Sequence, residues 1–566
     1  MASRGKTRAA GSNDLMTDRI EIYDTTLRDG SQGEGVNFSV DDKCRVAEQL
    51  DALGVDFIEG GWPGSNPRDL AFFERVRDLK LTRARVAAFG ATRRHTLSCD
   101  DDPSIQSLLE AETPVVTIFG KSWLLHVKDA LRLSPEENLE IIEDTMRYLS
   151  ARASCVIYDA EHFFDGYKTD PEYALATLHA AAAASPYRIV LCDTNGGSLP
   201  ETVARVTREV FEQIDVPLGI HCHNDGELAV ANTLAAVSAG AVHVQGTING
   251  YGERCGNANL CAVIPNLELK LNRTVLGPER LKKMRETSRF VSEIANLSLD
   301  SRTAFVGDSA FAHKGGVHVS AVERNPMTYE HIAPEAVGNR RRILVSDLAG
   351  RANLLAKARE LGVVLRDEKR VLEELKRLEH HGYEFEAAEA SFELLVSKLR
   401  GAHRPYFELL GFRVIDEHRG VLMPMSEATV KVKVGDRVEH TAASGNGPVN
   451  ALDNALRRAL QRFYPSLAEM HLVDYKVRVI TSNLSGSASL VRVLICSGDP
   501  DAQWGTVGVS ANIVEASWRA LVDSVEYKLA RDGVAPILGE QDDGSASKPS
   551  ESQSEAAGAS LKEAIS

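Results

Sequence analysis

Polar residues that could hold a metal ion fall where short apolar segments of the sequence end. His221 and His223 are two residues apart, so on a strand both imidazoles would point to the same side. Asp24 ends an earlier apolar segment, and Asn257 follows a later one. Two imidazoles, a carboxylate and an amide oxygen form a mixed donor set that suits Zn²⁺, Mn²⁺ or Mg²⁺ and leaves positions for a substrate. The pattern does not choose among these ions.

Three further residues near such ends could act on a small acid. Arg28 lies four residues after Asp24, and its planar guanidinium suits a carboxylate or a charge that develops on oxygen. Thr194 stands in an Asp-Thr-Asn sequence, where its hydroxyl could bind a carboxylate, although the same tripeptide also forms turns. Glu161 could be a general base, and a structural hydrogen bond to its own loop is the competing interpretation.

These residues can converge only if the segments that carry them form one barrel. Between residues 19 and 270, a short apolar run alternates eight times with a longer amphipathic stretch, which predicts a (β/α)8 barrel. Barrel closure would bring the seventh, eighth and first strands side by side, and with them the four candidate ligands. A doubly wound open sheet is disfavoured because no Gly-rich phosphate loop follows the first strand. The predicted strands are 20–25, 57–61, 86–90, 115–120, 156–161, 189–194, 218–223 and 242–248.

The length and the pattern of the chain predict further domains. A chain of 566 residues exceeds the size at which one hydrophobic core stops growing. We expect a catalytic barrel over 19–275, a helical linker over 276–385 with its clearest helices at 281–297 and 367–378, and an α+β domain over 386–538. That last domain carries a weak repeat at an offset of 65 residues. Residues 539–566 contain almost no large apolar residue and are predicted to be a disordered tail. Residues 1–18 show no periodicity and are also predicted to be a disordered tail, with the remnant of an organellar address as the alternative.

The composition narrows the class of partner. The chain carries 65 basic and 80 acidic residues, a net charge of −15, which disfavours nucleic acid and anionic membranes. The sequence contains no apolar run long enough to span a membrane and no secretory signal. We therefore expect a cytoplasmic enzyme that acts on small molecules. The eight cysteines are scattered and are interpreted as reduced thiols.

Three motifs resemble the family of 2-isopropylmalate, homocitrate and citramalate synthases. They are DTTLRDG at 24–30, HCHND at 221–225 and NGYGERCGNA at 249–258. The first two are shared with the lyases and aldolases of the wider metallolyase group of TIM barrels, whereas the third is similar to the synthases. The resemblance extends over about residues 20 to 535 and includes a C-terminal regulatory domain, which the lyases lack.

The resemblance implies the roles of individual residues. Asp24, His221 and His223 would hold the metal with Asn257, while Arg28 and Thr194 would bind a 2-oxo acid. Acetyl-CoA would be the co-substrate. Its base is not implied by the resemblance, and Glu161 or a water-mediated group is the candidate on position alone. His313 and Tyr329 resemble linker residues that reach the partner subunit's active site, so a homodimer is implied. The loops that contain Gly445, Gly447, Gly508 and Asn512 are similar to effector-binding loops, for which isoleucine or leucine is the expected effector.

The choice of 2-oxo acid depends on two shorter segments. Residues 60–67 and 159–167 look most like the citramalate branch of the family, which implies pyruvate as the acid that condenses with acetyl-CoA. Leucine-pathway chemistry with 2-oxoisovalerate is the alternative. A lyase or aldolase of the same barrel group, a metallohydrolase and a sensor with an inactive barrel remain as further alternatives.

Overall fold

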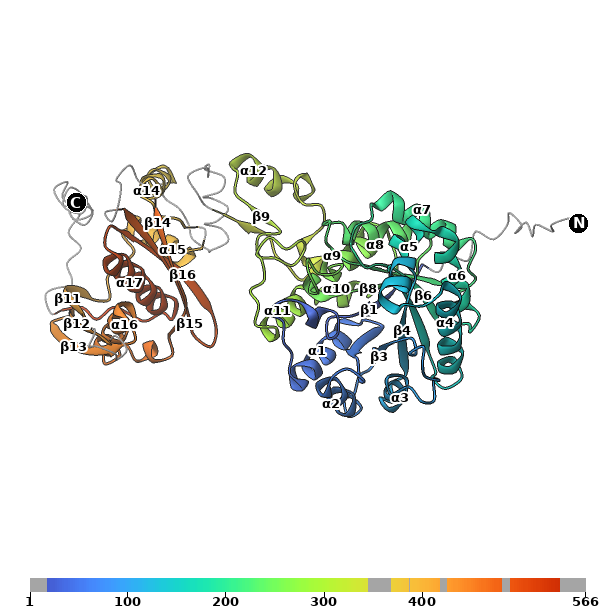
Figure 1. Ribbon diagram of the computed structural model, residues 1–566. Coiled ribbons are helices and arrows are strands. Elements are labelled where there is room, and N and C mark those ends of the chain that lie inside the picture. The colour runs from blue at the N-terminus through green and yellow to red at the C-terminus, as the bar shows by residue number, and fades with distance from the viewer. Residues whose placement is uncertain (1–17, 345–367, 386, 418–424, 481–488, 540–566) are drawn as a thin grey trace, which may run out of the picture. The chain divides into compact units, whose positions relative to one another are not determined.

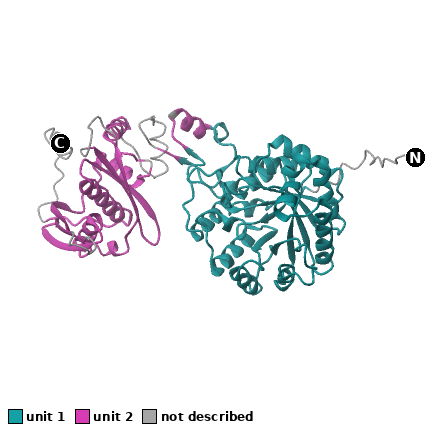
Figure 2. Cartoon of the chain, in the orientation of Figure 1, with its two compact units in different colours: residues 1–312, 325–342 teal, residues 313–324, 343–566 magenta. Residues whose placement is uncertain are grey.

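A computed structural model of the chain describes residues 18–344, 368–385, 387–417, 425–480 and 489–539. It divides into two compact units, drawn in different colours in Figure 2. Unit 1 comprises residues 1–312 and 325–342, and unit 2 comprises residues 313–324 and 343–566. Within the described residues, no helix is long and apolar enough to cross a membrane. Apart from Asp18 and Gly539, the two predicted tails lie outside the described residues.

Unit 1 contains a closed barrel of eight parallel strands, as the sequence predicts (Figure 1). The barrel closes where β8 pairs with β1, with His243 opposite Glu21 and Gly246 opposite Asp24. The strand bounds agree with the predicted ones to within a few residues. They are β1 Glu21–Asp24, β2 Phe57–Gly61, β3 Arg85–Ala91, β4 Val115–Lys121, β5 Val156–Glu161, β6 Arg188–Asp193, β7 Leu218–Cys222 and β8 His243–Gly246.

Helices surround the strands of the barrel (Figure 1). Several begin at strong sequence signals, since Ser39 and Ser134 form capping boxes with Asp42 and Glu137. A proline also occupies the first turn of α2, α3, α4, α6 and α7, where no backbone N–H is needed. The helices are α1 Val40–Leu53, α2 Pro67–Val76, α3 Pro103–Glu110, α4 Pro135–Ser150, α5 Phe163–Thr169, α6 Pro171–Ala182, α7 Pro200–Phe211, α8 Ala229–Ser238 and α9 Leu260–Leu269.

Alternation along the strands separates the barrel interior from the layer under the helices. Tyr23, Phe57, Val115 and Val190 belong to one small buried cluster inside the barrel. Their strand neighbours, such as Ile22, belong to the large core between strands and helices. Because side chains alternate with period two, every second residue of a strand faces the interior.

The chain after the barrel begins with α10 Pro278–Leu281 and α11 Met284–Ile294. The second of these falls within the helix predicted at 281–297. A two-stranded sheet follows, formed by β9 Ala312–His313 and β10 Arg342–Ile343, with α12 Gly316–Arg324 between them. The sequence pattern does not predict this sheet because its strands are only two residues long. Helix α14, Glu368–His380, corresponds to the helix predicted at 367–378.

Unit 2 contains two copies of a unit of three strands and one helix, as the repeat at an offset of 65 predicts. The first copy is an antiparallel sheet of β11 Glu408–Glu417, β12 Met425–Val434 and β13 Arg437–Gly445, followed by α16 Pro448–Leu460. The second consists of β14 His471–Ile480, β15 Leu490–Gly498 and β16 Gln503–Ser510, followed by α17 Ile513–Arg531. Helix α15, Glu389–Leu399, packs with α17 and β16.

Candidate active site

A carboxylate and two imidazoles meet at the carboxyl ends of the barrel strands. His221 lies on β7, His223 follows it, and Asp29 comes from the loop after β1. The His221 Nε2 and His223 Nε2 atoms are 3.3 Å apart. The Asp29 Oδ2 atom lies 3.5 Å from the first and 3.8 Å from the second. All three residues are buried, and they form the group of His, Cys, Asp and Glu side chains within the described residues that could hold a metal ion.

The geometry and the unused polar atoms of this group fit a divalent cation. Two nitrogen ligands about 2.1 Å from one ion are about 3.4 Å apart at a tetrahedral angle, close to the spacing of the two Nε2 atoms. Asp29 Oδ1 and Asn257 Oδ1 are buried and have no hydrogen-bond partner among the described residues. A buried oxygen without a partner is costly, and a bound cation would remove that cost.

The charge states of the group also suit a cation. Burial, followed by the neighbouring imidazole of His223, lowers the pKa of His221 to about 4. Burial likewise lowers the pKa of His223. Burial alone would raise the pKa of Asp29, but the charges of Arg28 and of the two histidines lower it to about 2. At neutral pH the site therefore presents neutral imidazoles and an ionised carboxylate, the forms that bind metals.

The carboxylate that lies beside the two imidazoles is that of Asp29 and not that of the predicted Asp24. Asp24 immediately follows the interior residue Tyr23 on β1, so alternation turns its side chain away from the barrel interior. Its two carboxylate oxygens accept hydrogen bonds from the backbone N–H and the hydroxyl of Thr26, at 2.9 and 3.0 Å. Burial raises the pKa of Asp24 to about 7. The sequence signal that could have found Asp29 was its place in the same loop, next to Arg28.

Arg28 is held at the site by groups that the sequence pattern did not single out. Its Nε donates to Glu59 Oε2 at 2.6 Å, and its Nη1 lies 3.3 Å from Asp29 Oδ2. Its guanidinium carbon lies 3.8 Å from the centre of the Phe89 ring. The hydroxyl of Tyr23 also donates to Glu59, at 3.0 Å. The buried carboxylate of Glu59 thus holds the guanidinium in place and partly balances its charge.

An aromatic wall lies beside Arg28 and consists of Trp62, Phe89 and Phe119. Phe89 and Phe119 stack with ring centres 5.4 Å apart. Trp62 meets both rings edge-on, at 6.1 and 5.7 Å. Phe89 and Phe119 come from β3 and β4, and Trp62 follows β2. This wall places bulky, rigid apolar surface next to the guanidinium that was predicted to bind a small acid.

Glu161 ends β5 and forms an ion pair with Lys121, which ends β4. Its carboxylate is partly exposed, with 23% of the side chain accessible. The next residue, His162, has a left-handed backbone with φ 56°. A carboxylate at the open end of the barrel is compatible with both interpretations made from the sequence, the general base and the structural partner.

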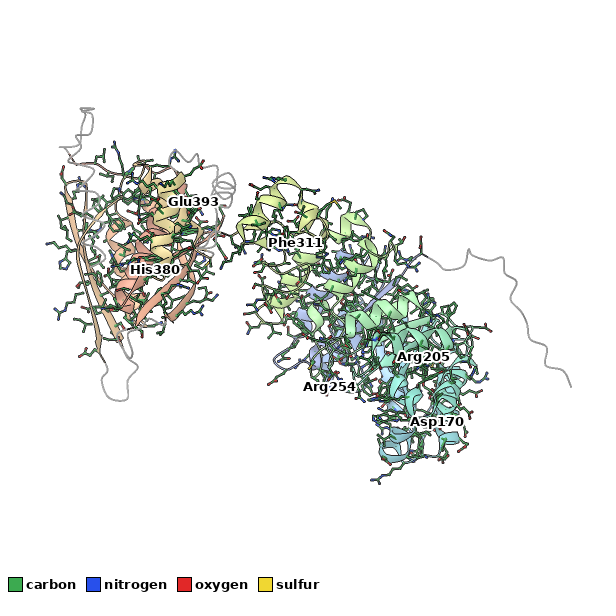
Figure 3. The ribbon with its side chains drawn as sticks, turned by 90° about the horizontal axis from the view of Figure 1, so that it is seen from above. Asp170, Arg205, Arg254, Phe311, His380 and Glu393 are labelled. Carbon is green, nitrogen blue, oxygen red and sulfur yellow. The ribbon has the colours of Figure 1, made fainter. Side chains whose placement is uncertain are left out.

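Thr194 follows β6 at the same end of the barrel. Its hydroxyl accepts a hydrogen bond from the backbone N–H of His162 at 2.8 Å. Its carbonyl accepts one from the guanidinium of Arg254 at 2.7 Å. Arg254 (Figure 3) also binds both carboxylate oxygens of Asp225, at 2.7 and 3.0 Å. Arg254 therefore links the loops after β6, β7 and β8, which carry Thr194, His223 and Asn257.

The two linker residues lie after the barrel. His313 belongs to β9 and is buried, whereas the side chain of Tyr329 is 47% exposed. Their role in a partner subunit's active site concerns a second chain and stays a prediction.

The glycines and the asparagine predicted for effector binding have structural roles in unit 2. A Cβ on Gly508 would lie 2.0 Å from the carbonyl oxygen of Ala516, so this glycine permits the close approach of β16 to α17. A Cβ on Gly445 would lie 2.4 Å from the backbone nitrogen of Ala451. Asn512 caps α17 and Gly447 precedes α16. Their predicted effector role stays a prediction, and substitution of either close-packed glycine would also disturb packing.

Comparisons with known proteins agree with this architecture. Residues 19–291 match the HMGL-like family, and residues 305–382 match the homocitrate synthase post-HMGL domain-like family. Residues 386–529 match the LeuA allosteric (dimerisation) domain. The fold and the site thus define the class of protein. It has an HMGL-like barrel, which contains a group of side chains that could hold a metal ion, and a LeuA allosteric domain.

Relatives over the full length narrow this class. An (R)-citramalate synthase of Geobacter sulfurreducens is 59% identical, covering 90% of this chain and 97% of its own. An (R)-citramalate synthase of Aquifex aeolicus is 54% identical, and the match covers 92% of this chain and 100% of the relative. A 2-isopropylmalate synthase of Halalkalibacterium halodurans is less similar, at 31% identity, and the match covers 92% of this chain and 99% of the relative. The chain belongs to the citramalate synthase family.

Proposed function

We propose that this chain condenses acetyl-CoA with pyruvate to give citramalate and CoA. The observation that carries the proposal is the Asp29, His221 and His223 group at the carboxyl end of an HMGL-like barrel. The relatives named (R)-citramalate synthase support pyruvate over 2-oxoisovalerate, because the 2-isopropylmalate synthases are less similar. Citramalate formation belongs to a route toward branched-chain amino acids.

Asp29, His221 and His223, with Asn257, are the proposed metal ligands. A divalent ion held there would supply Lewis-acid polarisation of the carbonyl of the 2-oxo acid. Arg28 binds the carboxylate of the acid or the oxygen on which charge develops, and Glu59 keeps its guanidinium aimed at that position. Thr194 is the proposed hydrogen-bonding partner of the substrate carboxylate.

A base must remove a methyl proton from acetyl-CoA. Glu161 is our candidate because its carboxylate lies at the open end of the barrel. His313 and Tyr329 of the partner subunit are proposed to complete the site. Attack of the resulting enolate on the carbonyl carbon, followed by thioester hydrolysis, would release citramalate and CoA.

The aromatic wall supports a small 2-oxo acid. Trp62, Phe89 and Phe119 pack against one another beside Arg28 and leave a rigid apolar surface there. A methyl group fits beside such a surface with less displacement than an isopropyl group, and each extra carbon in a tight pocket costs about 1–3 kcal/mol.

Unit 2 is proposed to bind an end-product amino acid, isoleucine or leucine. The LeuA domain match supports regulation and dimerisation. A cavity of about 390 Å³ lies beside the predicted effector loop and is lined by Ser444, Asn454, Arg457 and Arg458 among others. Arginine side chains suit the carboxylate of an amino acid.

The test of the proposal is thiol release from acetyl-CoA with a divalent metal present, measured in parallel with pyruvate, 2-oxoisovalerate and 2-oxoglutarate. We expect release with pyruvate, and with the other acids far less. Preference for 2-oxoisovalerate would move the activity to isopropylmalate synthesis. No release from a metal-loaded chain would favour the lyase or the sensor.

A further inference from the structure

A chain of two hydrogen bonds connects His221 to a buried carboxylate inside the barrel. His221 Nδ1 lies 2.9 Å from Gln245 Oε1 on the neighbouring strand β8. Gln245 Nε2 donates to Asp159 Oδ1 on β5, at 3.0 Å. Gln245 is fully buried, and Asp159 and His221 are each 4% exposed. All three side chains lie at interior-facing positions of their strands and are shielded from bulk solvent.

The two ends of the Gln245 amide are not equivalent, and this gives the chain a direction. In the structure the NH₂ end of the amide donates to Asp159 Oδ1. The carbonyl end then faces His221, which must donate from Nδ1. The lone pair of His221 is thereby left on Nε2, the atom that faces His223 and Asp29. A metal ligand needs that lone pair.

Burial raises the pKa of Asp159, and Glu59 adds to this effect, whereas Arg28 and the hydrogen bond from Gln245 act in the opposite sense. Asp159 and Gln245 are thus mutually dependent. The carboxyl group of Asp159 accepts the hydrogen bond from the amide, and this contact holds the amide in one orientation.

We propose that Gln245 and Asp159 are positioning residues that hold His221 as the Nδ1–H tautomer, so that its Nε2 is available to a divalent ion. The inference rests on the metal site of the proposed function. If Gln245 and Asp159 were only a satisfied polar pair of the core, their loss would lower stability without selectively weakening metal binding.

The experiment measures zinc affinity of the full-length protein by competition with a chromophoric chelator, without substrate. Gln245→Met keeps the length of the side chain but removes the acceptor for His221. We expect affinity to fall by about 10–100-fold, the usual effect of losing such a partner. Gln245→Glu keeps an acceptor oxygen for His221, and we expect it to bind zinc more tightly than Gln245→Met does.

A second variant tests the direction of the amide. Asp159→Asn presents either an acceptor or a donor to Gln245, so the amide is no longer held in one orientation, and we expect several-fold weaker binding. The matched control is Thr117→Val, which removes a 2.8 Å hydrogen bond to the Tyr23 hydroxyl inside the same barrel. It should leave zinc affinity unchanged.

Wild-type affinity in a folded Gln245→Met protein would overturn the inference, as would an equal loss in Thr117→Val. Folding is checked by circular dichroism and the thermal midpoint. If Gln245→Met does not fold, Asp159→Asn decides, and unchanged affinity there overturns the inference. The zinc titration contains no substrate, so it tests the positioning role separately from the reaction. If the wild-type protein binds zinc but releases no thiol in the separate activity assay, only the proposed function is contradicted.

Discussion

The carboxylate of Asp29, which faces the two imidazoles, is the one that we expect to contribute to the proposed metal site. We expect Asp29→Asn to lower zinc affinity by well over tenfold, because the ionised oxygen nearest both Nε2 atoms is lost. Asp24→Asn should keep nearly full affinity, because Asp24 bonds to Thr26 and not to the imidazoles. Metal content after gel filtration, together with chelator competition, measures both. Retained zinc in Asp29→Asn with loss in Asp24→Asn would reverse the assignment.

The aromatic wall beside Arg28 leads to a prediction about substrate choice. Phe119→Leu replaces the ring that stacks on Phe89 and meets Trp62 edge-on with a smaller aliphatic side chain. We expect the ratio of kcat/KM for 2-oxoisovalerate to that for pyruvate to rise by about tenfold, since space for extra carbons is gained. The matched control is Phe211→Leu on α7, a surface ring that is 42% exposed. An unchanged ratio in Phe119→Leu would show that the wall does not contact the substrate.

At the scale of single residues, the sequence predicted which strand ends carry the polar site better than which carboxylate faces it. His221 and His223 were predicted to lie together because they alternate at a strand end, and the structure places them together. Asp29 was missed because Asp24 stands at a strand end and Asp29 lies in the loop, where spacing gives no direction. Glu59 and Gln245 are single polar residues inside apolar segments, so the sequence pattern does not single them out.

At the scale of elements, the strand pattern carried most of the information. Apolar runs and their spacing are local properties, so they predicted all eight barrel strands and the two three-stranded sheets. The two-residue strands β9 and β10 depend on pairing between distant segments, which no local pattern encodes. Alternation turns Asp24 away from the interior because Tyr23 faces it, and the structure, not the local pattern, shows which face Tyr23 takes.

The strand ends opposite the active site hold a polar cluster that makes stability depend on pH. Glu21 on β1 accepts from Tyr187 and Arg188 and lies 3.3 Å from His243 Nδ1 on β8. Burial would raise the pKa of Glu21, but these partners lower it from 4.5 to about 2. The lowered pKa means that the ionised carboxylate stabilises the fold above pH 4.5 and that this contribution is lost as the pH falls toward 2.

We therefore expect Glu21→Gln to destabilise unit 1 at pH 7 by about 1–2 kcal/mol, a figure reduced for partial solvent screening. The difference from the wild type should shrink as the pH is lowered from 5 toward 3. Thermal midpoints of both proteins over this range measure it, with the surface variant Glu212→Gln as the control. A difference independent of pH would mean that the charge of Glu21 contributes nothing.

At the scale of the whole molecule, the dimerisation domain raises the question of whether one active site needs two chains. If His313 acts in the partner's barrel, Asp29→Asn and His313→Ala damage the same site from opposite chains. Each homodimer should then be inactive. A heterodimer of the two variants has one site in which both residues are intact and one in which both are replaced.

We expect this heterodimer, purified through two different affinity tags, to show about half of the wild-type activity per dimer. If His313 instead served its own barrel, each chain of the heterodimer would carry one damaged residue in its own site, and the mixture would stay inactive. A fully active His313→Ala homodimer would remove His313 from the mechanism altogether. Thiol release with pyruvate distinguishes the three outcomes, because wild-type chains carrying the same two tags set the reference for an intact pair of sites.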